Sequence, residues 1–364
     1  MSTPFRQLYR VVYSKETAVP ATRSGVVNGY HLLEAAVPYV MTGKLVERVM
    51  LTDPNLKHEP IQHKPFHPNV KNVLIFFPGG IGDVISLKPV LQAFREQRPE
   101  VSVAVVSSLA DHCLVGDVAT LYDYPIPEAI ANQYDAWVNI AETDRASVGQ
   151  ELSETFAEFL GIECPQTAAD LKVDNGLAFA LQGYLADPFR PRIGIHMDSA
   201  SHFRSIPRYL GALVMMSLID KGFDCYVLGG PENRVVFTQN GAGTAPPEHI
   251  YDMTGFLGPL EHYMAFLKHM DVLLTCDTGA LHIAGALGVP TVGVFGMTDG
   301  SKRTSFYPSV SYVQAEKDCS PCERVTEEVP CDNQWCLAIA EIGPEKLVQK
   351  VLEVYRENIT GEDF

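Results

Sequence analysis

An aspartate directly after a glycine turn is the first residue whose position suits chemistry. Residues 75–85 read IFFPGGIGDVI, so an apolar run meets the turn Gly79 to Gly82, and Asp83 stands where a helix should begin. A carboxylate there accepts backbone N–H bonds and complements the helix dipole. At the rim of a binding cleft it would instead act as a general base. Spacing alone favours the capping role and leaves the catalytic role open.

The glycine turn departs from a dinucleotide-binding fingerprint at two points. Gly80 and Gly82 are followed by Ile85 where a third glycine belongs. The next predicted strand ends in Ser107 and Ser108, without the acidic residue that would bind a ribose. We therefore expect no nicotinamide or flavin, and no cofactor for catalysis.

A second stretch, residues 272–299, reads VLLTCDTGALHIAGALGVPTVGVFGMTD. A buried strand is expected to end before Asp277, and Thr278 and Gly279 would open a helix that carries His282. Backbone N–H groups at such a helix start bind anions, and a diphosphate fits there. His282 alone also has the ordinary interpretation of a hydrogen-bonded interior histidine.

Two polar loop residues suit the same kind of ligand. Glu232 follows a Gly-Gly-Pro turn, from which a carboxylate could accept ribose hydroxyls. Arg204 lies in HMDSASHFRSIP, from which a guanidinium could pair with phosphate oxygens. Each of them alone is equally an ordinary surface residue.

The elements around these residues predict two Rossmann-like domains. Short apolar runs alternate with helical stretches, as in parallel βαβ units, and ligands bind at the carboxyl ends of such strands. A helix interrupted near Pro38 is predicted within 30–50, and an amphipathic helix after Gly343. Strands are predicted at 73–77, 101–106, 193–197, 225–228, 272–276 and 292–295.

Composition bounds the class of protein. A chain of 364 residues with 46% hydrophobic content suits two domains with real cores. A formal net charge of −16 argues against nucleic acid as a partner. We find neither a membrane-spanning run nor a secretory signal, so the chain is interpreted as cytoplasmic. Residues 1–70 carry eight Lys/Arg and five Asp/Glu, a basic segment that leaves peripheral attachment at the inner membrane open.

The two ordered motifs resemble those of a known enzyme family. GDVISLKPVLQAFREQRPEVSVAVV and DTGALHIAGALGVPTVGVFGMTD are similar to glycosyltransferase family 9, the ADP-heptose:lipopolysaccharide heptosyltransferases, over residues 71–358. The resemblance implies an α/β fold of GT-B type, with two Rossmann-like domains facing a cleft. It also implies inverting, metal-independent transfer of heptose or a similar sugar. ADP-heptose is the expected donor, and a hydroxyl of a cell-surface glycan such as lipopolysaccharide core is the expected acceptor.

The resemblance also assigns domains and residue roles. It implies an N-terminal extension (1–70), an acceptor-side domain (71–187), a nucleotide-sugar domain (188–342) and a C-terminal helix (343–364) packing back on the first domain. Asp83 would be the general base that deprotonates the acceptor. Asp277 would contact the sugar, and the residues proposed to hold the rest of the donor are Arg204, Glu232, Thr278, Gly279 and His282.

Departures from the family pattern leave the donor open. Met197 and Asp198 replace an expected Pro-Gly, Ile206 stands where tryptophan is frequent, and Met297 and Gly300 replace prolines of an FGPTDP-like loop. Other functions remain alternatives: a protein heptosyltransferase, a nucleotide-sugar epimerase, or a non-catalytic sugar-nucleotide-binding subunit. The acceptor is thus a glycan, a glycolipid or a protein.

A late cysteine cluster forms a separate candidate site. Cys319, Cys322, Cys331 and Cys336 lie within CSPCERVTEEVPCDNQWC. Four thiolates so close in sequence could hold a structural zinc or iron, or they could be reduced thiols, since only the first pair has tight ligand spacing.

Overall fold

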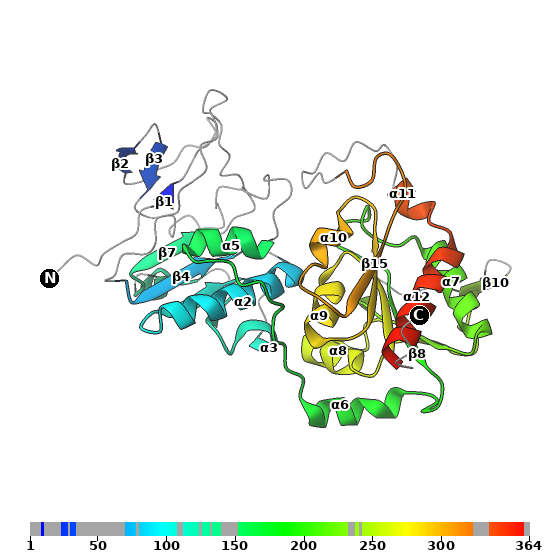
Figure 1. Cartoon of the computed structure of the whole chain (residues 1–364). Helices are drawn as coiled ribbons and strands as arrows, with labels where there is room; N and C mark the ends of the chain where they lie inside the picture. The colour runs from blue at the N-terminus through cyan, green and yellow to red at the C-terminus, as the bar shows by residue number, and fades with distance from the viewer. Residues whose placement is uncertain are drawn as a thin grey trace. The chain divides into compact units, whose positions relative to one another are not determined.

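The computed structural model of the chain consists of two compact units, Met1–Thr167 and Ala168–Phe364 (Figure 1). Among the described residues, no helix is both long and apolar enough to cross a membrane. The structure describes residues 9–10, 23–27, 30–33, 70–77, 80–107, 112–123, 126–131, 133–139, 152–231, 237–239, 242–322 and 335–359.

The first unit contains a parallel sheet with the strand order β6-β5-β4-β7. Its strands are β4 (Asn72–Phe76), β5 (Ser102–Val106), β6 (Thr120–Tyr122) and β7 (Ala136–Asn139). Val73, Leu74 and Ile75 have no exposed surface, which suits a central parallel strand buried on both faces. The predicted strands at 73–77 and 101–106 are confirmed to within one residue.

Helix α2 (Ile81–Gln97) begins directly after the glycine turn and carries Asp83. Helix α5 (Leu152–Leu160) packs along it, and Oγ of Ser153 donates to the carbonyl of Ser86 at 3.1 Å. The rings of Phe77 and Phe156 meet edge to face at 5.3 Å. Two short helices complete the described part of this unit, α3 (His112–Val115) and α4 (Glu128–Ala131).

The N-terminal segment contains an antiparallel sheet with the order β1-β3-β2. Its strands are β1 (Tyr9–Arg10), β2 (Arg23–Val27) and β3 (Tyr30–Leu33). The helix predicted from residue 30 is therefore wrong over β3, and its remainder lies outside the described residues. Val27 pairs with Tyr30, so Asn-Gly alone separates two strands, and this dipeptide is a strong hairpin signal that outweighs helical periodicity.

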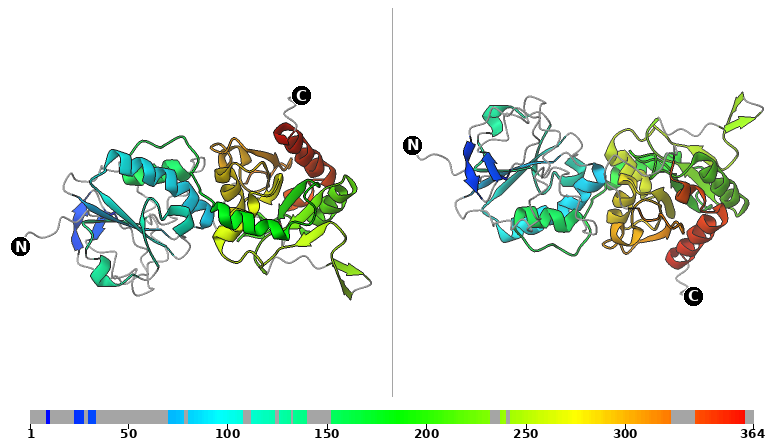
Figure 2. Two further views of the ribbon diagram at one scale, coloured as in Figure 1. Left: turned by 90° about the horizontal axis from the view of Figure 1, so that it is seen from below. Right: turned by 90° about the horizontal axis from the view of Figure 1, so that it is seen from above.

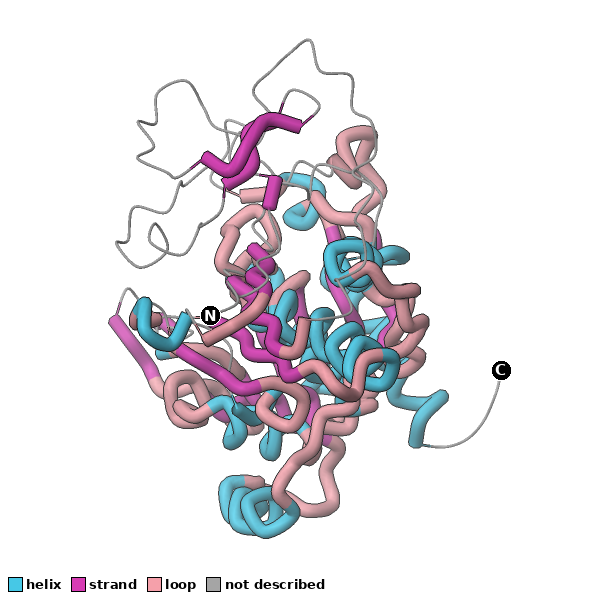
Figure 3. Tube along the Cα trace, turned by 90° about the vertical axis from the view of Figure 1, so that its left-hand side faces the viewer, coloured by secondary structure: helices cyan, strands magenta, loops and turns pink. Residues whose placement is uncertain are grey.

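The second unit contains a larger parallel sheet with the order β12-β9-β8-β13-β14-β15. Strands are drawn in magenta in Figure 3. All five residues of β13 are buried, as its apolar sequence predicts for a central strand. The strands are β8 (Arg192–His196), β9 (Asp224–Val227), β12 (Ile250–Asp252), β13 (Val272–Cys276), β14 (Thr291–Phe295) and β15 (Val310–Gln314). The hairpin β10 (Phe237–Gln239) and β11 (Ala242–Thr244) projects from the body of this unit (Figure 2).

Helices cover both faces of this sheet. Figure 1 shows α8 (Leu260–Leu267) and α9 (Gly279–Leu287) on one face, with α7 (Arg208–Asp220) and α12 (Pro344–Ile359) on the other. The remaining described helices are α6 (Asn175–Leu181), the 3-10 helix η2 (Gln182–Tyr184), α10 (Gly300–Arg303) and α11 (Leu337–Ala340).

The C-terminal helix α12 packs against α7 in the core of the second unit, and its expected packing on the first domain stays a prediction. Leu347, Val351 and Val354 are buried in one core with Leu210 and Val214 of α7. The amphipathic pattern correctly predicted a packed helix. It could not identify the partner, because any apolar surface satisfies such a stripe.

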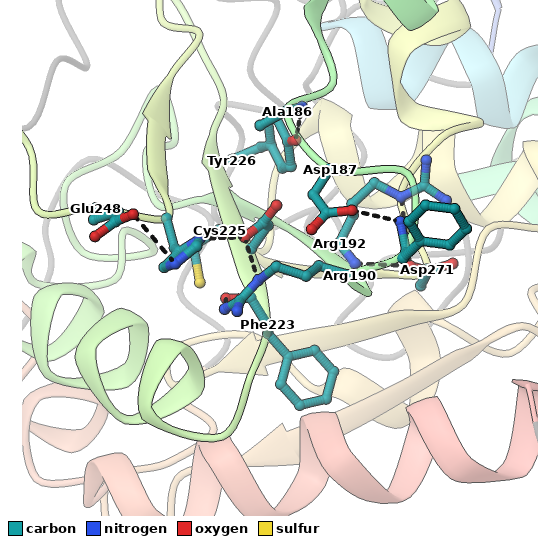
Figure 4. A network of polar contacts seen from close by, with 12 residues as sticks. Ala186, Asp187, Arg190, Arg192, Phe223, Cys225, Tyr226, Glu248 and Asp271 are labelled. Carbon is teal, nitrogen blue, oxygen red and sulfur yellow. Dashed lines mark hydrogen bonds and ion pairs between the residues drawn. The ribbon is translucent and has the colours of Figure 1, made fainter.

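A buried polar network stabilises the amino end of this sheet (Figure 4). Asp224 has no exposed surface and accepts from Nε of Arg190 at 2.8 Å, with Nδ1 of His249 at 2.9 Å from the same oxygen. The backbone N–H of Ala186 donates to the hydroxyl of Tyr226 at 3.0 Å. These bonds connect residues 186–190 to β9, and they give the buried Asp224 side chain hydrogen-bond partners in place of water.

Candidate functional site

The loops after three neighbouring strands converge at the carboxyl end of the second sheet. Asp277 follows β13, Arg204 lies in the loop between β8 and α7, and Thr298 lies in the loop after β14. Oγ1 of Thr298 donates to Oδ2 of Asp277 at 2.9 Å, and Nη1 of Arg204 lies 3.6 Å from the same oxygen. The structure thus brings together two residues that the sequence predicted, and adds Thr298.

Asp277 is an ionised carboxylate held in a buried position. Its side chain is 3% exposed, and burial by itself would raise its pKa. The nearby guanidinia of Arg303 and Arg204, with His282 and the Thr298 hydroxyl, outweigh burial and lower the pKa below its ordinary value. The site therefore combines one buried anion with an excess of positive charge, which suits a second anion supplied by a ligand.

The start of α9 has the geometry predicted for an anion site. Thr278 is the N-cap in extended conformation, and α9 begins at Gly279. The Thr278 side chain makes no capping hydrogen bond, and the N–H of Leu281 donates to the carbonyl of Thr278 at 3.0 Å, so the N–H groups ahead of Leu281 are the ones suited to a ligand. Thr278 and Gly279 are both partly exposed, which leaves their amides accessible to a ligand.

The loop that carries Arg204 is fixed to the start of this site. Oγ of Ser199 donates to the backbone carbonyl of Asp277 at 3.1 Å, and the Ser199 N–H donates to Oγ of Ser205 at 3.0 Å. The backbone N–H of Ile206 donates to the carbonyl of Met197 at 2.8 Å. Since both ends of the loop are bonded, Arg204 is held beside Asp277 rather than left on a loose surface loop.

His282 lies one turn into α9 and is 8% exposed. Its Nδ1 is 3.2 Å from the hydroxyl of Tyr307, whose ring packs against Gly285. These contacts agree with the interior interpretation, while the electrostatic effect of His282 on Asp277 places it close to the site. Its predicted role in donor binding stays a prediction.

A partly buried histidine at the end of β8, His196, was missed by the sequence interpretation. Burial lowers the pKa of His196 to about 4, although a backbone hydrogen bond at Asp198 opposes the shift. Burial raises the pKa of Tyr263, so its hydroxyl keeps its proton, and it forms a hydrogen bond with Nδ1 of His196 at 2.8 Å. Only the position of His196 at a strand end could have indicated it.

Asp83 lies in the first unit, at the third position of α2. Its Oδ2 accepts the backbone N–H of Gly80 at 2.8 Å, so the capping role is real. The side chain is partly exposed, which is compatible with a second role as a base. Gly82 is the second residue of the same helix, and its carbonyl accepts from Oγ of Ser86 at 3.1 Å.

Two predicted groups are incompletely described. Glu232 lies outside the described residues, as does Cys331. Cys319 is exposed, Cys322 is partly exposed and Cys336 is buried. In the described ranges of the chain, no group of three or more His, Cys, Asp or Glu side chains could hold a metal ion.

Comparison with known proteins places these motifs in one family. The sequence profile of glycosyltransferase family 9 (heptosyltransferase) matches residues 131–331. No curated protein matches the sequence of this chain.

Solved structures share the fold at low sequence identity. ADP-heptose lipopolysaccharide heptosyltransferase II of E. coli aligns at a TM-score of 0.58 and 13% identity, covering 79% of this chain and 99% of its own. A family 9 glycosyltransferase of Veillonella parvula aligns at 0.58 and 16%, covering 79% and 97%. The iron-containing dodecameric glycosyltransferase TibC of enterotoxigenic E. coli aligns at 0.59 and 14%, covering 81% of each chain. The predicted α/β class, with parallel sheets like those of GT-B-type heptosyltransferases, is confirmed.

Proposed function

Because the chain belongs to glycosyltransferase family 9, we propose that it transfers heptose or a similar sugar from ADP-heptose to a hydroxyl of a cell-surface glycan such as lipopolysaccharide core. The chain is a glycosyltransferase, and a nucleotide-sugar is the general class of its donor. One observation carries the choice of donor site, namely the convergence of Asp277, Arg204 and the start of α9.

The leaving group of the proposed reaction is a nucleoside diphosphate. Its departure needs positive charge, which the N–H groups of Thr278 and Gly279 and the guanidinium of Arg204 would supply. Asp277, held by Thr298, would accept hydrogen bonds from hydroxyls of the donor sugar. Glu232 would accept those of the ribose. This arrangement supports a transfer without a catalytic metal.

The acceptor hydroxyl needs a base. We assign this role to Asp83, which would take the proton as the acceptor oxygen attacks the anomeric carbon. The new bond forms on the face opposite the departing diphosphate, so a single displacement inverts the anomeric centre. The hydrogen bond from the Gly80 N–H to Oδ2 of Asp83 orients the carboxylate for this role.

A structural metal at the late cysteines is a separate part of the proposal. Burial raises the pKa of Cys336, and Cys322 and Cys319 lie near enough to raise it further. The described thiols alone do not form a metal-binding group. TibC is iron-containing. Elemental analysis for iron and zinc, with Cys336→Ser as comparison, tests this site. If the protein contains neither metal, the cysteines are reduced thiols.

The function is tested by donor selection followed by transfer. A thermal-shift titration with ADP-, GDP- and UDP-sugars should show selective stabilisation by ADP-heptose, since a ligand of the folded state raises apparent stability. Release of ADP should then require an acceptor and disappear in Asp83→Asn. Stabilisation by another nucleotide-sugar would show that this sugar, and not ADP-heptose, is the donor. Acceptor-independent conversion of the donor would indicate an epimerase. Transfer to a protein acceptor would identify a protein heptosyltransferase, and binding without turnover a non-catalytic subunit.

A further inference from the structure

Thr298, which bonds to Asp277, lies in the loop after β14. We call this loop, residues 296–300, the Thr298 loop. Met297 and Gly300 stand where the family pattern has prolines. A proline ring fixes φ and stiffens a loop without any partner. This chain must therefore hold the Thr298 loop in another way.

The side chain of Gln314, the last residue of β15, bonds to this loop at both ends. Its Oε1 accepts the backbone N–H of Gly300 at 3.0 Å. Its Nε2 donates to the carbonyl of Thr298 at 3.2 Å and reaches the carbonyl of Gly296 at 3.4 Å. One partly buried amide thus contacts the first, third and fifth residues of the loop.

These contacts fix the orientation of the amide. A flipped Gln314 would turn Oε1 toward two carbonyl oxygens and Nε2 toward the N–H of Gly300, leaving like groups opposed on both sides. The bond from Gly300 exists because this residue is not proline and keeps its N–H. Glycine is also required there by space, since a Cβ would lie 2.6 Å from the ring of Tyr312 and 2.9 Å from that of Phe295.

A second support comes from the cysteine segment. Oγ of Ser320 donates to the carbonyl of Gly296 at 2.7 Å and accepts from Nε2 of Gln314 at 2.9 Å. A Cβ on Gly296 would lie 2.5 Å from Ile339 and 2.9 Å from the sulfur of Cys336. Gln314 therefore bonds to the Thr298 loop directly and also to Ser320, which lies in the segment between Cys319 and Cys322.

We propose that Gln314 is a positioning residue of the donor site, which holds the Thr298 loop so that Thr298 orients Asp277 toward the donor. The consequence for the donor rests on the proposed function. The residue acts through Thr298, so its loss should misplace the Asp277 carboxylate without removing any group that contacts the donor.

The first test compares donor kinetics of Gln314→Leu, Gln314→Glu and a control. Both variants lose the donating amide, and Glu keeps the size and the acceptor for Gly300. Each should raise the donor KM about tenfold, the effect of one net hydrogen bond. Gln349→Leu removes an exposed glutamine that bonds only to Glu353 on α12 and should leave KM unchanged. Thermal unfolding of each variant excludes misfolding as the cause.

A double-mutant cycle distinguishes positioning from a general structural role. Thr298→Val removes the hydroxyl that bonds Asp277 while keeping the shape. If Gln314 acts through Thr298, adding Gln314→Leu to Thr298→Val should change the donor KM by less than twofold. Independent tenfold losses in both backgrounds would overturn the proposal.

Hydrogen exchange tests the loop contacts without any substrate. Amides of residues 296–304 should exchange faster in Gln314→Leu than in the wild type or in Gln349→Leu. Unchanged exchange would overturn the proposal, as would faster exchange with an unchanged donor KM. Faster exchange in a protein that binds no nucleotide-sugar would refute the proposed function and the role of Gln314 in donor binding. It would still support the conclusion that Gln314 stabilises the Thr298 loop.

Discussion

Thr298 donates its hydroxyl proton to Oδ2 of Asp277 over 2.9 Å, although 21 residues separate them in sequence. The bond joins the loop after β14 to the residue after β13. It occupies one carboxylate oxygen, which Arg204 also approaches. The orientation of this buried carboxylate is thus set before any ligand binds, and preorganised charge of this kind is what favours a transition state.

Asp83→Asn should abolish transfer while preserving the fold. The amide oxygen of asparagine can still accept the N–H of Gly80, but it cannot take a proton from an acceptor. Activity should fall at least about a hundredfold, as loss of a general base predicts. Asp83→Ala removes the cap as well and should cost about 1 kcal/mol more in the free energy of unfolding. Transfer by Asp83→Asn at the wild-type rate would leave Asp83 as a cap alone.

Arg204→Ala should weaken binding of the donor diphosphate. A charge-assisted hydrogen bond contributes about 1.5–3 kcal/mol, so the donor Kd should rise roughly tenfold to a hundredfold. Calorimetric titration with the nucleoside diphosphate measures this change. Arg356→Ala, which removes an exposed arginine on α12, is the matched control for net charge. Equal affinities of the two variants would remove Arg204 from the site.

Asp277→Asn should lower stability in a pH-dependent manner. The pKa of this carboxylate is lower in the folded state than in the unfolded chain, so its contribution is present above about pH 4 and is lost as the pH falls through the folded value. Urea unfolding should show a difference of about 1–3 kcal/mol at pH 6 that narrows toward pH 3. A constant difference over this range would contradict the lowered pKa.

His196 should make the folded state sensitive to mild acid. Its pKa falls to about 4 on folding from about 6.5, so the stabilisation is complete above pH 6.5 and is lost as the pH falls toward 4. The loss should amount to roughly 1–3 kcal/mol in the free energy of unfolding. His196→Gln should remove this part of the pH dependence, whereas substitution of the exposed His202 by glutamine should retain it.

Gly285→Ala tests the packing behind the site. A Cβ at this position would lie 2.5–2.9 Å from three atoms of Tyr307, too close for the ring to stay in place. Such overpacking should cost about 1–3 kcal/mol in the free energy of unfolding. Gly258→Ala is the control, because nothing lies within 4 Å of its Cβ. Equal stability of the two variants would show that Tyr307 can move aside.

Local sequence predicted the central strands and the start of α9 well. The bounds of the strand at 272–276 were predicted correctly, because the short run VLLTC, followed by Asp-Thr-Gly, has few other interpretations. Arg204 and Asp277, predicted as separate donor residues, lie beside each other. Both lie at the carboxyl ends of parallel strands, where topology brings distant residues together.

What the sequence could not predict depends on tertiary contact. The stripe of α12 was recognised, but its packing against α7 was not, because amphipathicity does not name a partner. Thr298 lies in the FGPTDP-like loop and Gln314 lies in no motif, and neither sequence position indicates which atom of another strand or loop its side chain contacts. Arg303 follows a lysine on a short helix, so its sequence position indicates only a surface charge. In the structure it lowers the pKa of Asp277 more than Arg204 does.

The two ends of the second sheet differ in what they contain: the buried network of Asp224 lies at one end and the candidate donor site lies at the other. This separation affects which substitutions the protein can tolerate. Asp224 and its partners lie where the strands begin, whereas Asp277 and Thr298 lie where they end. Substitutions at distant sites without shared partners have nearly additive effects. Under the proposed function, selection can therefore alter sugar preference through the loops at one end while the fold keeps its stability at the other, which makes those loops the natural targets for mutational libraries.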